Sequence, residues 1–439
     1  MSENNQNDLT AKIVSLCKRR GIVFQNSEIY GGIQGFYDYG PVGSLMKYNW
    51  KNLWLKNNVQ QRDDVVLIDG SIITHPMVWT ASGHVKNFAD ELVECKKCHH
   101  RFRPDLISFS KKCPDCTGEL TTPKKYNTLF HTDVGVIEGE TIHTYLRGEA
   151  CQTIYLDFKN IIDSARVKIP FGIAQIGKAF RNEITPKNFL YRTREFEQWD
   201  IQYFCHPNDM DKFYEYWKQN RIDWYLSLFN NQENLRFRQH EKDELAFYAK
   251  IAFDIEYNAP WGWTEMEGIH WRSDYDLTQH STFSKQDLSY RDPITNEKYI
   301  PHIVETSGGV DRSFFFLLLD SYREETNEKG EVRIYLKINP KISAYKMAVF
   351  PLAANKPELV DIATNLYKSL KSKYSVDFDD SSNIGKKYRR HDEIGTPWCA
   401  VVDYQTLEDK TISIRDRDTM EQIRLPIDQI DAWLQNKLQ

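Results

Sequence analysis

The sequence predicts an α+β protein of two domains, a large one built on an antiparallel sheet and a small C-terminal one of α/β type. Alternating apolar runs at 152–158 and 197–204 are typical of antiparallel strands. Beyond about residue 340, strand and helix patterns alternate over about a hundred residues, which favours a small domain with a mixed sheet. Four closely spaced cysteines interrupt the large domain. We therefore expect domains at 1–340 and 341–439, with a cysteine-rich insert at about 91–125.

Helical and extended patterns follow one another along the large domain. Residues 9–20 and 44–59 place apolar residues at helical spacing, and a glycine-rich aromatic connection at 27–43 separates them. Residues 64–73 have the composition of a strand. At 210–229 the aromatic residues form a stripe of helical period, which we interpret as core packing and not as a ligand-binding surface.

The C-terminal part alternates between the two patterns. Helices are expected at 357–374 and 427–438, and strands within 337–352, 375–380, 399–404 and 410–418. One basic run with an aromatic residue inside it extends from Lys386 to His391. A solvated face is one interpretation of this run, and an RNA contact is favoured over it because the rest of the chain is mildly acidic.

Composition excludes several classes of protein. The 439-residue chain is 41% apolar and 13% aromatic, as in soluble globular proteins with large cores. No run approaches the roughly 18 apolar residues of a membrane span, and the first residues lack the basic and apolar parts of a signal peptide. We therefore expect a cytoplasmic protein. With a net charge of −5, any contact with nucleic acid has to come from local patches.

Four of the eight cysteines form a compact group, with two residues inside each pair and fourteen between the pairs: Cys95, Cys98, Cys113 and Cys116. Two such pairs on a short hairpin have the spacing of a tetrahedral zinc site. Disulfides are the alternative, but they fit poorly with a cytoplasmic chain whose other cysteines are dispersed. Four thiolates leave no position for water or substrate, so the predicted zinc ion is structural.

Two further segments point to chemistry. The first, from Phe180 to Asp200, reads FRNEITPKNFLYRTREFEQWD and groups arginines, glutamates and a phenylalanine around a turn. An arginine fork can hold a phosphate, a carboxylate can accept from an exocyclic amine, and an aromatic ring can stack on a base. A charged hairpin with solvated arms is the alternative. The second segment, Glu305 to Arg312, reads ETSGGVDR and precedes the apolar run SFFFLLLDSY.

Together the two segments resemble motifs 2 and 3 of the class II aminoacyl-tRNA synthetases, and their wording is similar to that of the homodimeric glycyl-tRNA synthetases. The resemblance extends from GFYDYGPVG at 35–43 to KKYRRHDEIGTPWC at 386–399. It implies a class II catalytic domain on an antiparallel sheet and a C-terminal anticodon-binding domain. It also implies a homodimer whose contact lies in the 44–73 region. Five aromatic residues in or near that region are expected to offer apolar surface for it: Phe36, Tyr37, Tyr39, Trp50 and Trp54.

The implied reaction has two steps. Glycine and ATP form glycyl-adenylate and pyrophosphate, and the glycyl group is then transferred to tRNA(Gly). Neither step needs a covalent enzyme nucleophile, so catalysis depends on positioning and on charge stabilisation at the α-phosphate. Magnesium is expected because the triphosphate has to be neutralised.

Carried over residue by residue, the resemblance gives catalytic roles to Arg181, Glu183 and Arg312. Arg181 would hold the α-phosphate, Glu183 would accept from the adenine amine, and Arg312 would reach the γ-phosphate. Phe196 would stack on adenine, while glycines beside Arg312, Gly308 and Gly309, would permit close backbone approach. The implied ATP-binding residues are Arg181, Asn182, Glu183, Tyr191, Arg192, Arg194, Phe196, Glu265, Met266, Gly309, Asp311 and Arg312.

The resemblance also implies a pocket for the amino acid. Three acids, Glu149, Asp200 and Glu305, would surround the glycine ammonium, and a pocket of that size would reject larger amino acids by steric clash. The implied glycine-binding residues are Arg103, Glu149, Glu197, Gln198, Asp200, Glu305 and Ser307. For Arg103, inside the cysteine-rich insert, a solvated side chain is the alternative.

The chain departs from the family pattern in three places. The family's RPETAQG is RGEACQT at 147–153, its FEQME is FEQWD ending at Asp200, and the proline of its EPS is Thr306. One carboxylate is therefore a methylene shorter, which concerns the amino-acid pocket and not the ATP-binding residues. Two alternatives stay open: a synthetase paralogue that charges another acceptor, and a non-catalytic nucleic-acid-binding relative. The intact arginines at 181 and 312 argue against the second.

Overall fold

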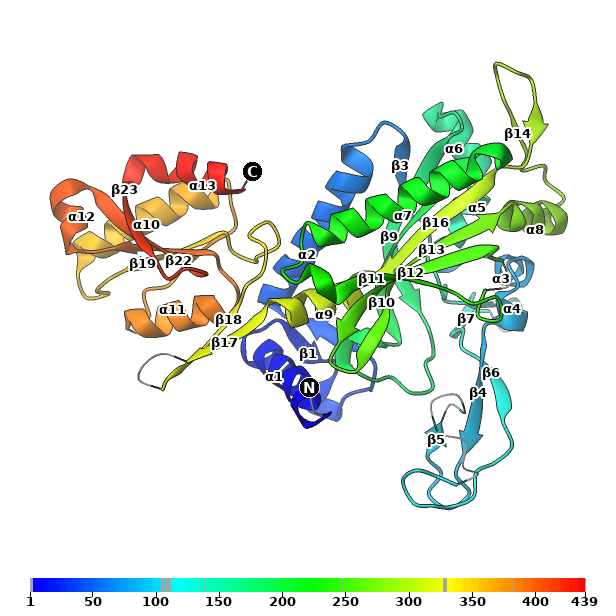
Figure 1. Cartoon of the computed structure of the whole chain (residues 1–439), viewed down its shortest axis with the longest axis horizontal. Coiled ribbons are helices and arrows are strands. Elements are labelled where there is room, and N and C mark those ends of the chain that lie inside the picture. Colours follow the sequence, from blue (N-terminus) through cyan, green and yellow to red (C-terminus); the bar gives the residue numbers. More distant parts are fainter. Residues whose placement is uncertain are drawn as a thin grey trace.

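The chain folds around two main sheets, as the computed structural model shows (Figure 1). The structure describes residues 3–102, 104, 107, 112–137, 139–246, 248–326, 330–381 and 383–438. Within these residues, a seven-stranded sheet forms the large body and a five-stranded sheet forms the C-terminal body. The hairpin of β17 (Tyr322–Thr326) and β18 (Val332–Leu336) lies between them. The predicted α+β arrangement is confirmed, while the limits of the two domains stay predictions.

The large sheet is antiparallel except at one edge, where β3 runs parallel to β9. In spatial order its strands are β11 (Leu235–Gln239), β12 (Ile251–Ala259), β13 (Gly262–Ser273), β16 (His302–Gly309), β10 (Glu195–Cys205), β9 (Phe171–Phe180) and β3 (Val65–Ile68). Successive side chains of a strand point to opposite faces. On β10, Phe196, Gln198 and Asp200 therefore share one face, and Glu197 and Trp199 share the other.

Three helices cover one face of the large sheet, α2 (Pro41–Leu55), α7 (Met210–Leu226) and α9 (Val310–Ser321), and α1 (Glu3–Arg19) packs on α9. Trp54 of α2 stacks on Trp199 of β10 with ring centroids 5.6 Å apart, and Trp50 stacks on Trp224 of α7 at 4.8 Å. The helices predicted at 9–20, 44–59 and 210–229 are confirmed, and the aromatic stripe of the third is core.

A buried ion pair stabilises this packing. Arg221 of α7 donates through Nε to Glu267 of β13 at 2.6 Å, and both side chains are fully buried. Trp199 Nε1 donates to the same carboxylate at 3.0 Å. The neighbouring Gly308 has no room for a side chain, because a Cβ there would lie 2.5 Å from Trp199 Nε1. Packing alone therefore requires glycine at position 308.

The aromatic side chains expected at a dimer surface are mostly used inside the monomer. Trp50 and Trp54 are completely buried, and the Tyr39 hydroxyl donates to Asp311 at 2.6 Å. Helix α2 turns its aromatic side towards the sheet, so the prediction of surface tryptophans is wrong. The exposed apolar side chains of the same region are different ones: Ile29, Tyr30, Ile33, Tyr48, Leu67 and Ile73.

The opposite face of the sheet is covered by shorter helices. These are α5 (Gln152–Leu156), α6 (Phe158–Ala165) and α8 (Tyr275–Ser284), and α3 (Pro76–Ala81) and α4 (His84–Asn87) lie beside them. The strand predicted at 152–158 is therefore wrong, because these residues form α5 and the start of α6. A short apolar run that is buried on all sides has no periodicity to separate helix from strand. The strand predicted at 197–204 is confirmed as part of β10.

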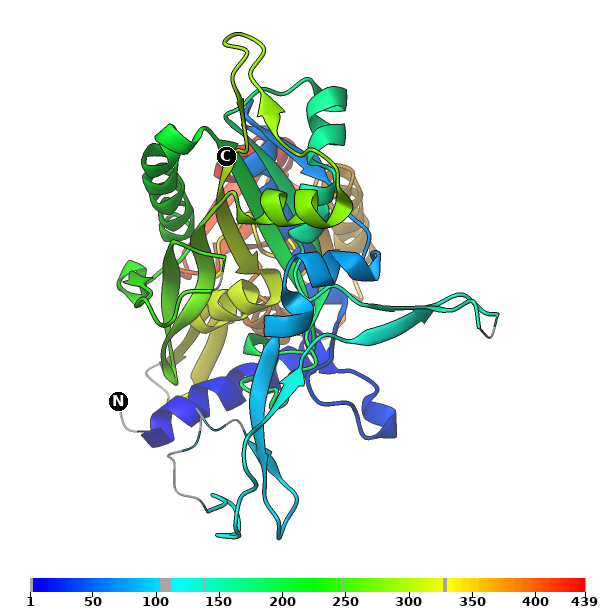
Figure 2. The same cartoon turned by 90° about the vertical axis from the view of Figure 1, so that its right-hand side faces the viewer.

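The cysteine-rich insert is a ribbon that projects from the large body. Its strands are β4 (Ala89–Glu94), β5 (Arg101–Phe102) and β6 (Lys124–Asn127), and β4 pairs with both of the others. Figures 1 and 2 show this ribbon extending away from both sheets. A second hairpin, of β7 (His131–Val134) and β8 (Ile142–Tyr145), projects separately in Figure 2.

The C-terminal sheet is mixed, as predicted: β19 is parallel to β20 and β21, and the remaining pairs are antiparallel. In spatial order the strands are β20 (Val376–Phe378), β19 (Met347–Pro351), β21 (Trp398–Val402), β22 (Thr411–Asp416) and β23 (Gln422–Pro426). Helices α10 (Pro357–Lys371) and α13 (Ile430–Leu438) pack on one face, α11 (Ile384–Glu393) packs on the other, and α12 (Tyr404–Asp409) follows β21.

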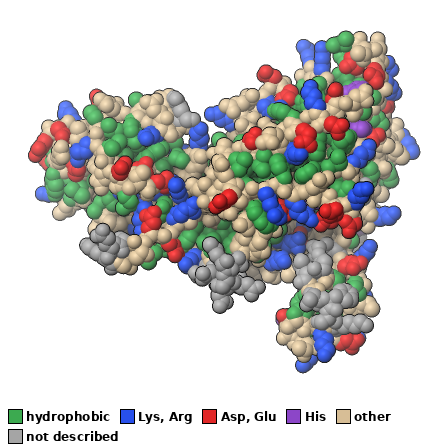
Figure 3. Space-filling view, in the orientation of Figure 1, with side chains coloured by type: hydrophobic (Ala, Val, Ile, Leu, Met, Phe, Trp, Pro, Cys, Tyr) green, Lys and Arg blue, Asp and Glu red, His purple; other side chains and the backbone are tan. Residues whose placement is uncertain are grey.

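The basic run at 386–391 belongs to α11, which joins the two bodies. Lys387 and His391 are buried. Glu393, at the end of the helix, accepts from Arg19, the last residue of α1, at 3.1 Å and from the following Arg20 at 2.6 Å. On the face seen in Figure 3, acidic and basic side chains are interspersed over both bodies. The RNA contact stays a prediction, with fewer exposed charges in the run than the sequence suggests.

Candidate functional site

A cavity of about 290 Å³ opens on the face of the large sheet that carries Phe196 and Gln198. Its walls come from β10, β13 and β16, from the segment between β9 and β10, and from residues 240–254. The fold thus joins segments that are more than a hundred positions apart in the sequence. Most of the predicted site residues line this cavity: Glu149, Arg181, Glu183, Tyr191, Arg192, Phe196, Gln198, Glu265, Glu305, Ser307, Gly309, Asp311 and Arg312.

One half of the cavity is basic. Arg181 lies between two rings, with its guanidinium carbon 5.0 Å from the Phe88 centroid and 5.6 Å from that of Phe196. Its Nε donates to Gly148 O at 3.0 Å. Stacking on rings and one backbone bond hold the guanidinium while leaving its remaining donors for an anion.

Arg312 forms the second basic contact. It pairs with Glu265 at 2.9 Å and lies over the Tyr191 ring, with 4.8 Å between guanidinium carbon and ring centroid. The charge of Glu265 raises the pKa of Arg312 although burial opposes this. Beside them, burial and the charge of Glu265 raise the pKa of Asp254 to about 6. The carboxylates of Glu265 and Asp254 carry like charges, and a cation bound beside them would stabilise both.

Glu183 presents an unused acceptor. Its Oε2 is buried and accepts no hydrogen bond from the described residues. The nearest cation is Arg192, whose Nε lies 3.7 Å from that oxygen, which is too far for a hydrogen bond. A buried carboxylate oxygen without a donor is costly, so this geometry fits a ligand that brings a donor of its own.

The other half of the cavity is acidic. Glu149, from the segment before α5, and Glu305, from β16, line it, and Asp200 of β10 lies buried beneath them. The Sγ of Cys151 and carboxylate oxygens of Asp200 and Glu305 all lie within 4.8 Å of one another. Three carboxylates in so small a volume repel one another unless cations face them.

Three side chains face these carboxylates: Arg272 and His84, which are buried, and His270, which is partly buried. Arg272 of β13 donates to both oxygens of Glu305, at 3.0 and 3.1 Å, and His270 lies 2.6 Å from the same carboxylate. His84 lies 3.1 Å from Glu149. Burial alone would raise the pKa of Glu305, but the charge of Arg272 and the bond from His270 hold it below its usual value. Burial would also raise the pKa of Glu149, but the effects of His84 and Arg272 lower it by more, so this pKa is well below its usual value.

Asp200 behaves in the opposite way. Its Oδ1 accepts from Gln202, whereas its Oδ2 is buried and accepts no hydrogen bond from the described residues. Burial and the charge of Glu305 raise the pKa of Asp200 well above its usual value. The pKa values of the two carboxyl groups are thus shifted in opposite directions, downwards for Glu305 and upwards for Asp200.

Several predicted residues have other positions. Glu197 lies on the opposite face of β10, where it pairs with Lys47 of α2 at 2.7 Å, so strand alternation keeps it out of the cavity. Met266 is completely buried in the core. Arg194 donates to the backbone of Glu183 at 3.1 Å and shapes the loop from outside.

The remaining residues are placed as follows. Asn182 lines a neighbouring hollow beside the cysteine-rich insert and not the main cavity. Asp311 reaches the cavity wall, but its carboxylate is held by Lys47 and Tyr39. Gln198 donates to Ser307 and accepts from Ala150 N at 2.9 Å, which orders the floor between the two halves. Arg103 lies outside the described residues.

The sequence signals missed three residues that the site needs: His84, His270 and Arg272. Each touches a carboxylate of the acidic half. A single histidine or arginine beside an apolar strand has no pattern that separates it from an ordinary core residue, so only the fold identifies them.

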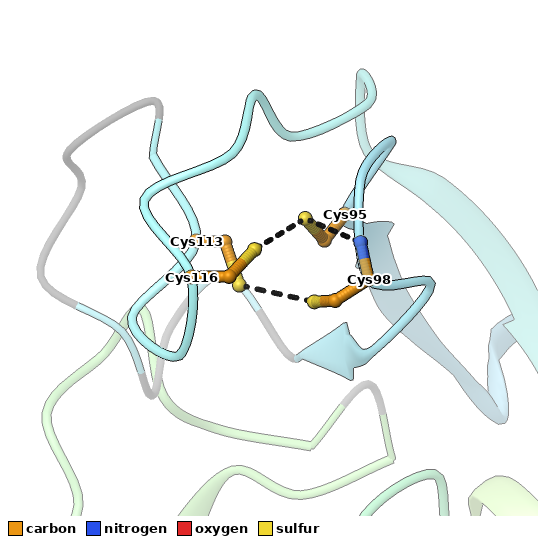
Figure 4. A group of neighbouring side chains, drawn as sticks. All are labelled: Cys95, Cys98, Cys113 and Cys116. Carbon is orange, nitrogen blue, oxygen red and sulfur yellow. Dashed lines mark hydrogen bonds between the residues drawn. The ribbon is translucent and has the colours of Figure 1, made fainter.

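The four cysteines converge at the tip of the insert (Figure 4). The Sγ atoms of Cys95 and Cys116 are 3.4 Å apart, those of Cys98 and Cys113 are 3.6 Å apart, and all four lie within 4.8 Å of one another. A tetrahedron with metal–sulfur bonds of about 2.3 Å has edges of about 3.8 Å. The backbone N–H of Cys98 donates to Cys95 Sγ and lowers the pKa of Cys95 to about 6. The cluster is free of disulfides and suits a metal ion.

Two family models match the chain. One, described as tRNA synthetase class II core domain (G, H, P, S and T), matches residues 136–386, which is more than half of the chain. The other, described as Anticodon binding domain, matches residues 346–437.

Curated relatives named Glycine--tRNA ligase are similar over nearly the full length. That of Borreliella burgdorferi is 47% identical over 431 residues, 97% of this chain and 97% of the relative. That of Treponema denticola is 49% identical over 424 residues, 94% of each. That of Caldanaerobacter subterraneus subsp. tengcongensis is 46% identical, over 97% of this chain and 98% of the relative.

A solved structure supports the fold. Prolyl-tRNA Synthetase from Cryptosporidium parvum, complexed with L-Proline and AMP, matches with a TM-score of 0.66 at 16% identity, over 97% of this chain and 74% of that one. At this identity the likeness concerns the fold alone. Among the helices that the structure describes, none has the length and apolar character needed to cross a bilayer.

Proposed function

The chain belongs to the glycine–tRNA ligases of class II, and from this premise we propose how its residues carry out the ATP-dependent ligation of glycine to tRNA(Gly). The observation that carries the proposal is a single cavity with a basic half, containing Arg181 and Arg312, and an acidic half, containing Glu149 and Glu305. A zwitterionic amino acid and a triphosphate have complementary charges. The two reactants can therefore lie side by side in one orientation.

In the basic half, Arg181 holds the α-phosphate and the glycine carboxylate, since its guanidinium is fixed by two rings and keeps free donors. Adenine lies against Phe196, its amine donates to the vacant Oε2 of Glu183, and Arg312 covers the other side. The glycine carboxylate attacks the α-phosphorus and pyrophosphate leaves. A hydroxyl of the terminal ribose of the tRNA then attacks the carbonyl carbon of the adenylate, and AMP leaves as the ester forms. Arg181 stabilises charge that grows in the transition state.

Magnesium, when bound, neutralises the triphosphate. Glu265 is the protein carboxylate that we propose for it. Its side chain is half exposed at the cavity and has Asp254 as an acidic neighbour. The carboxylate of Glu265 would bind the magnesium ion in place of Arg312. Arg312 would then be free to contact the phosphates.

In the acidic half, Glu149, Asp200 and Glu305 receive the glycine ammonium, with Ser307 beside them. The buried Oδ2 of Asp200 and the cluster within 4.8 Å support this assignment. A substrate side chain larger than hydrogen would have to fit beside three carboxylates and the Cys151 thiol, and we expect it to clash.

Four further assignments complete the proposal. The four-cysteine cluster binds one structural zinc ion, which its sulfur spacing supports. The protein is a cytoplasmic homodimer, with exposed apolar side chains such as Tyr48 and Leu67 in its contact. The catalytic domain comprises 1–340 with the insert at about 91–125, and 341–439 binds the anticodon. No described residue is assigned to the reading of anticodon bases.

The first prediction tests the function and its pocket together. Glycine should drive ATP–pyrophosphate exchange without tRNA, while alanine and serine should not. Asp200→Asn should lower glycine-dependent exchange by about two orders of magnitude with little change in the KM for ATP, because a charge facing a cation is lost. Since Asp200 has to lose its proton to meet the ammonium, the wild-type KM for glycine should fall as pH rises, and the variant should lose this dependence.

Asp200→Glu is the matched control and should be far milder, because it restores a carboxylate at the cost of one methylene. Exchange driven equally by alanine or serine, or an Asp200→Asn variant as active as wild type, would mean that the pocket is assigned wrongly.

A second prediction concerns the phosphate clamp. Arg181→Ala should slow adenylate formation on the order of a hundredfold or more, because the guanidinium meets charge that develops on the α-phosphate. Single-turnover measurement of adenylate formation would give the rate, and circular dichroism would confirm the fold. Arg181→Lys, which keeps the charge without the fork, should be intermediate. An alanine variant within a few-fold of wild type would place the clamp elsewhere.

The third prediction separates zinc from the reaction. Metal analysis of freshly purified protein should find about one equivalent of zinc, and Cys113→Ser should lose it while still forming adenylate. Cys205→Ser, which changes a buried cysteine outside the cluster, should keep the zinc. Less than about a tenth of an equivalent in the wild type would contradict a zinc site, and an inactive but folded Cys113→Ser would contradict a purely structural role.

The fourth prediction is a homodimer. Light scattering at micromolar concentration should give twice the mass of the 439-residue chain. Leu67→Asp should shift the equilibrium towards monomer, because it places a charge on an exposed apolar edge strand. Ile294→Asp, at an exposed apolar residue outside that region, should not. A wild-type protein that scatters as a single chain would overturn the assignment.

A further inference from the structure

Glu149 is held on one of its two oxygens. Cys151 Sγ, Gln152 Nε2 and His84 Nε2 lie 2.9, 3.0 and 3.1 Å from Oε1. No described residue donates to Oε2, so that oxygen is left for a ligand in the cavity. Cys151 and Gln152 belong to the same segment as Glu149 and move with it. His84 is the contact that ties the carboxylate to another part of the fold.

The imidazole of His84 is buried and is held by one polar contact and two aromatic rings. It is 2% exposed, and its Nδ1 lies 2.8 Å from Ser82 Oγ. The ring packs edge-on against Trp79, with centroids 5.2 Å apart, and lies 5.1 Å from Phe88. In the tautomer that carries the ring proton on Nε2, Ser82 Oγ donates to Nδ1 and the Nε2–H group faces Glu149.

His84 and Phe88 stand at the base of the cysteine-rich insert. Asn127, the last residue of β6, donates to His84 O at 3.1 Å and to Val85 O at 2.9 Å. Thr128 N donates to Phe88 O at 3.0 Å, and Thr128 O accepts from Asn182 N at 2.7 Å.

The same base reaches the other half of the cavity. The ring of Phe88 supports Arg181, with 5.0 Å between its centroid and the guanidinium carbon. One short structure, residues 82–88 with 127–128, therefore touches both the carboxylate of the acidic half and the arginine of the basic half.

We propose that the base of the insert is a positioning element of the active site, and that His84 holds the Glu149 carboxylate in the orientation that receives the substrate ammonium. This rests on the proposed glycine-binding role of Glu149. His84 does not touch the substrate, so it is a positioning residue and takes no part in proton transfer to or from the reactants. The metal-binding tip of the insert is not needed for this role, because the hydrogen bonds at the base do not pass through the cysteines.

The test compares KM values for the two substrates in pyrophosphate exchange. His84→Ala should raise the KM for glycine about ten- to hundredfold, the effect expected when a hydrogen bond to a buried charge is lost, and leave the KM for ATP within about twofold. His84→Gln, whose amide can still donate to Glu149, should restore most of the loss. His206→Ala is the matched control, since His206 also faces a glutamate, Glu297 at 3.5 Å, but just beyond the far end of β10.

Ser82→Ala provides a smaller change in case His84→Ala does not fold. It removes the hydroxyl that orients the ring, and a selective rise in the KM for glycine is expected again. An unchanged KM for glycine in a folded His84 or Ser82 variant would overturn the proposal, as would equal rises for glycine and ATP without rescue by glutamine. A wild-type protein without glycine-dependent exchange would instead overturn the proposed function, so the two failures are distinguishable.

Discussion

The structure around the cavity depends on one electrostatic constraint, the presence of three carboxylates in one buried place. Glu149, Asp200 and Glu305 are all buried, and the charges of Glu305 and Glu149 both raise the pKa of Asp200. Arg272 is the main cation that compensates this negative charge. It is fully buried, donates to Glu305 and to both oxygens of Asp276, and lies 3.6 Å from the Tyr248 ring centroid. A buried cation with fewer partners would destabilise the fold. The position of α8, which carries Asp276, is therefore required to keep Arg272 fully paired.

The two faces of the large sheet are coupled although their chemistry differs. On the helix-covered face, Lys47 of α2 pairs with Glu197 and Asp311. Asp311 also accepts from Glu197 N, and it directly precedes Arg312, whose guanidinium enters the cavity. The packing of α2 therefore helps to set the position of the backbone from which the Arg312 side chain extends into the cavity. Residues that do not reach the cavity, such as Glu197, can affect the site through this contact. Mutating them would separate substrate binding from positioning only if the KM values for glycine and ATP were measured separately.

The sequence predicted most of the architecture because its signals are local. Helical periodicity identified α1, α2 and α7, and the change of pattern near residue 340 identified the second sheet. Cysteine spacing predicted the cluster. The failures have a common cause. Burial on all sides removed the periodicity of α5, and the choice of face at Glu197 and Met266 depends on strand register, which is set by partners distant in sequence. His84 and Arg272 were missed because their importance comes from what the fold places against them.

The arrangement of charge also explains why no nucleophile is needed. Arg181 at one end of the cavity and the Glu149–Glu305 pair at the other form a fixed dipole, and a free amino acid carries the opposite one. In the proposed function, glycine then enters in one direction only, with its carboxylate at Arg181, the residue proposed to hold the α-phosphate. Binding thus brings the attacking oxygen to the phosphorus with its orientation already chosen, which can lower a barrier by several kcal/mol through positioning alone. The raised pKa of Asp200 fits this arrangement. Burial and the charge of Glu305 favour the protonated form of this carboxyl group, and an ammonium group placed beside it would favour the carboxylate.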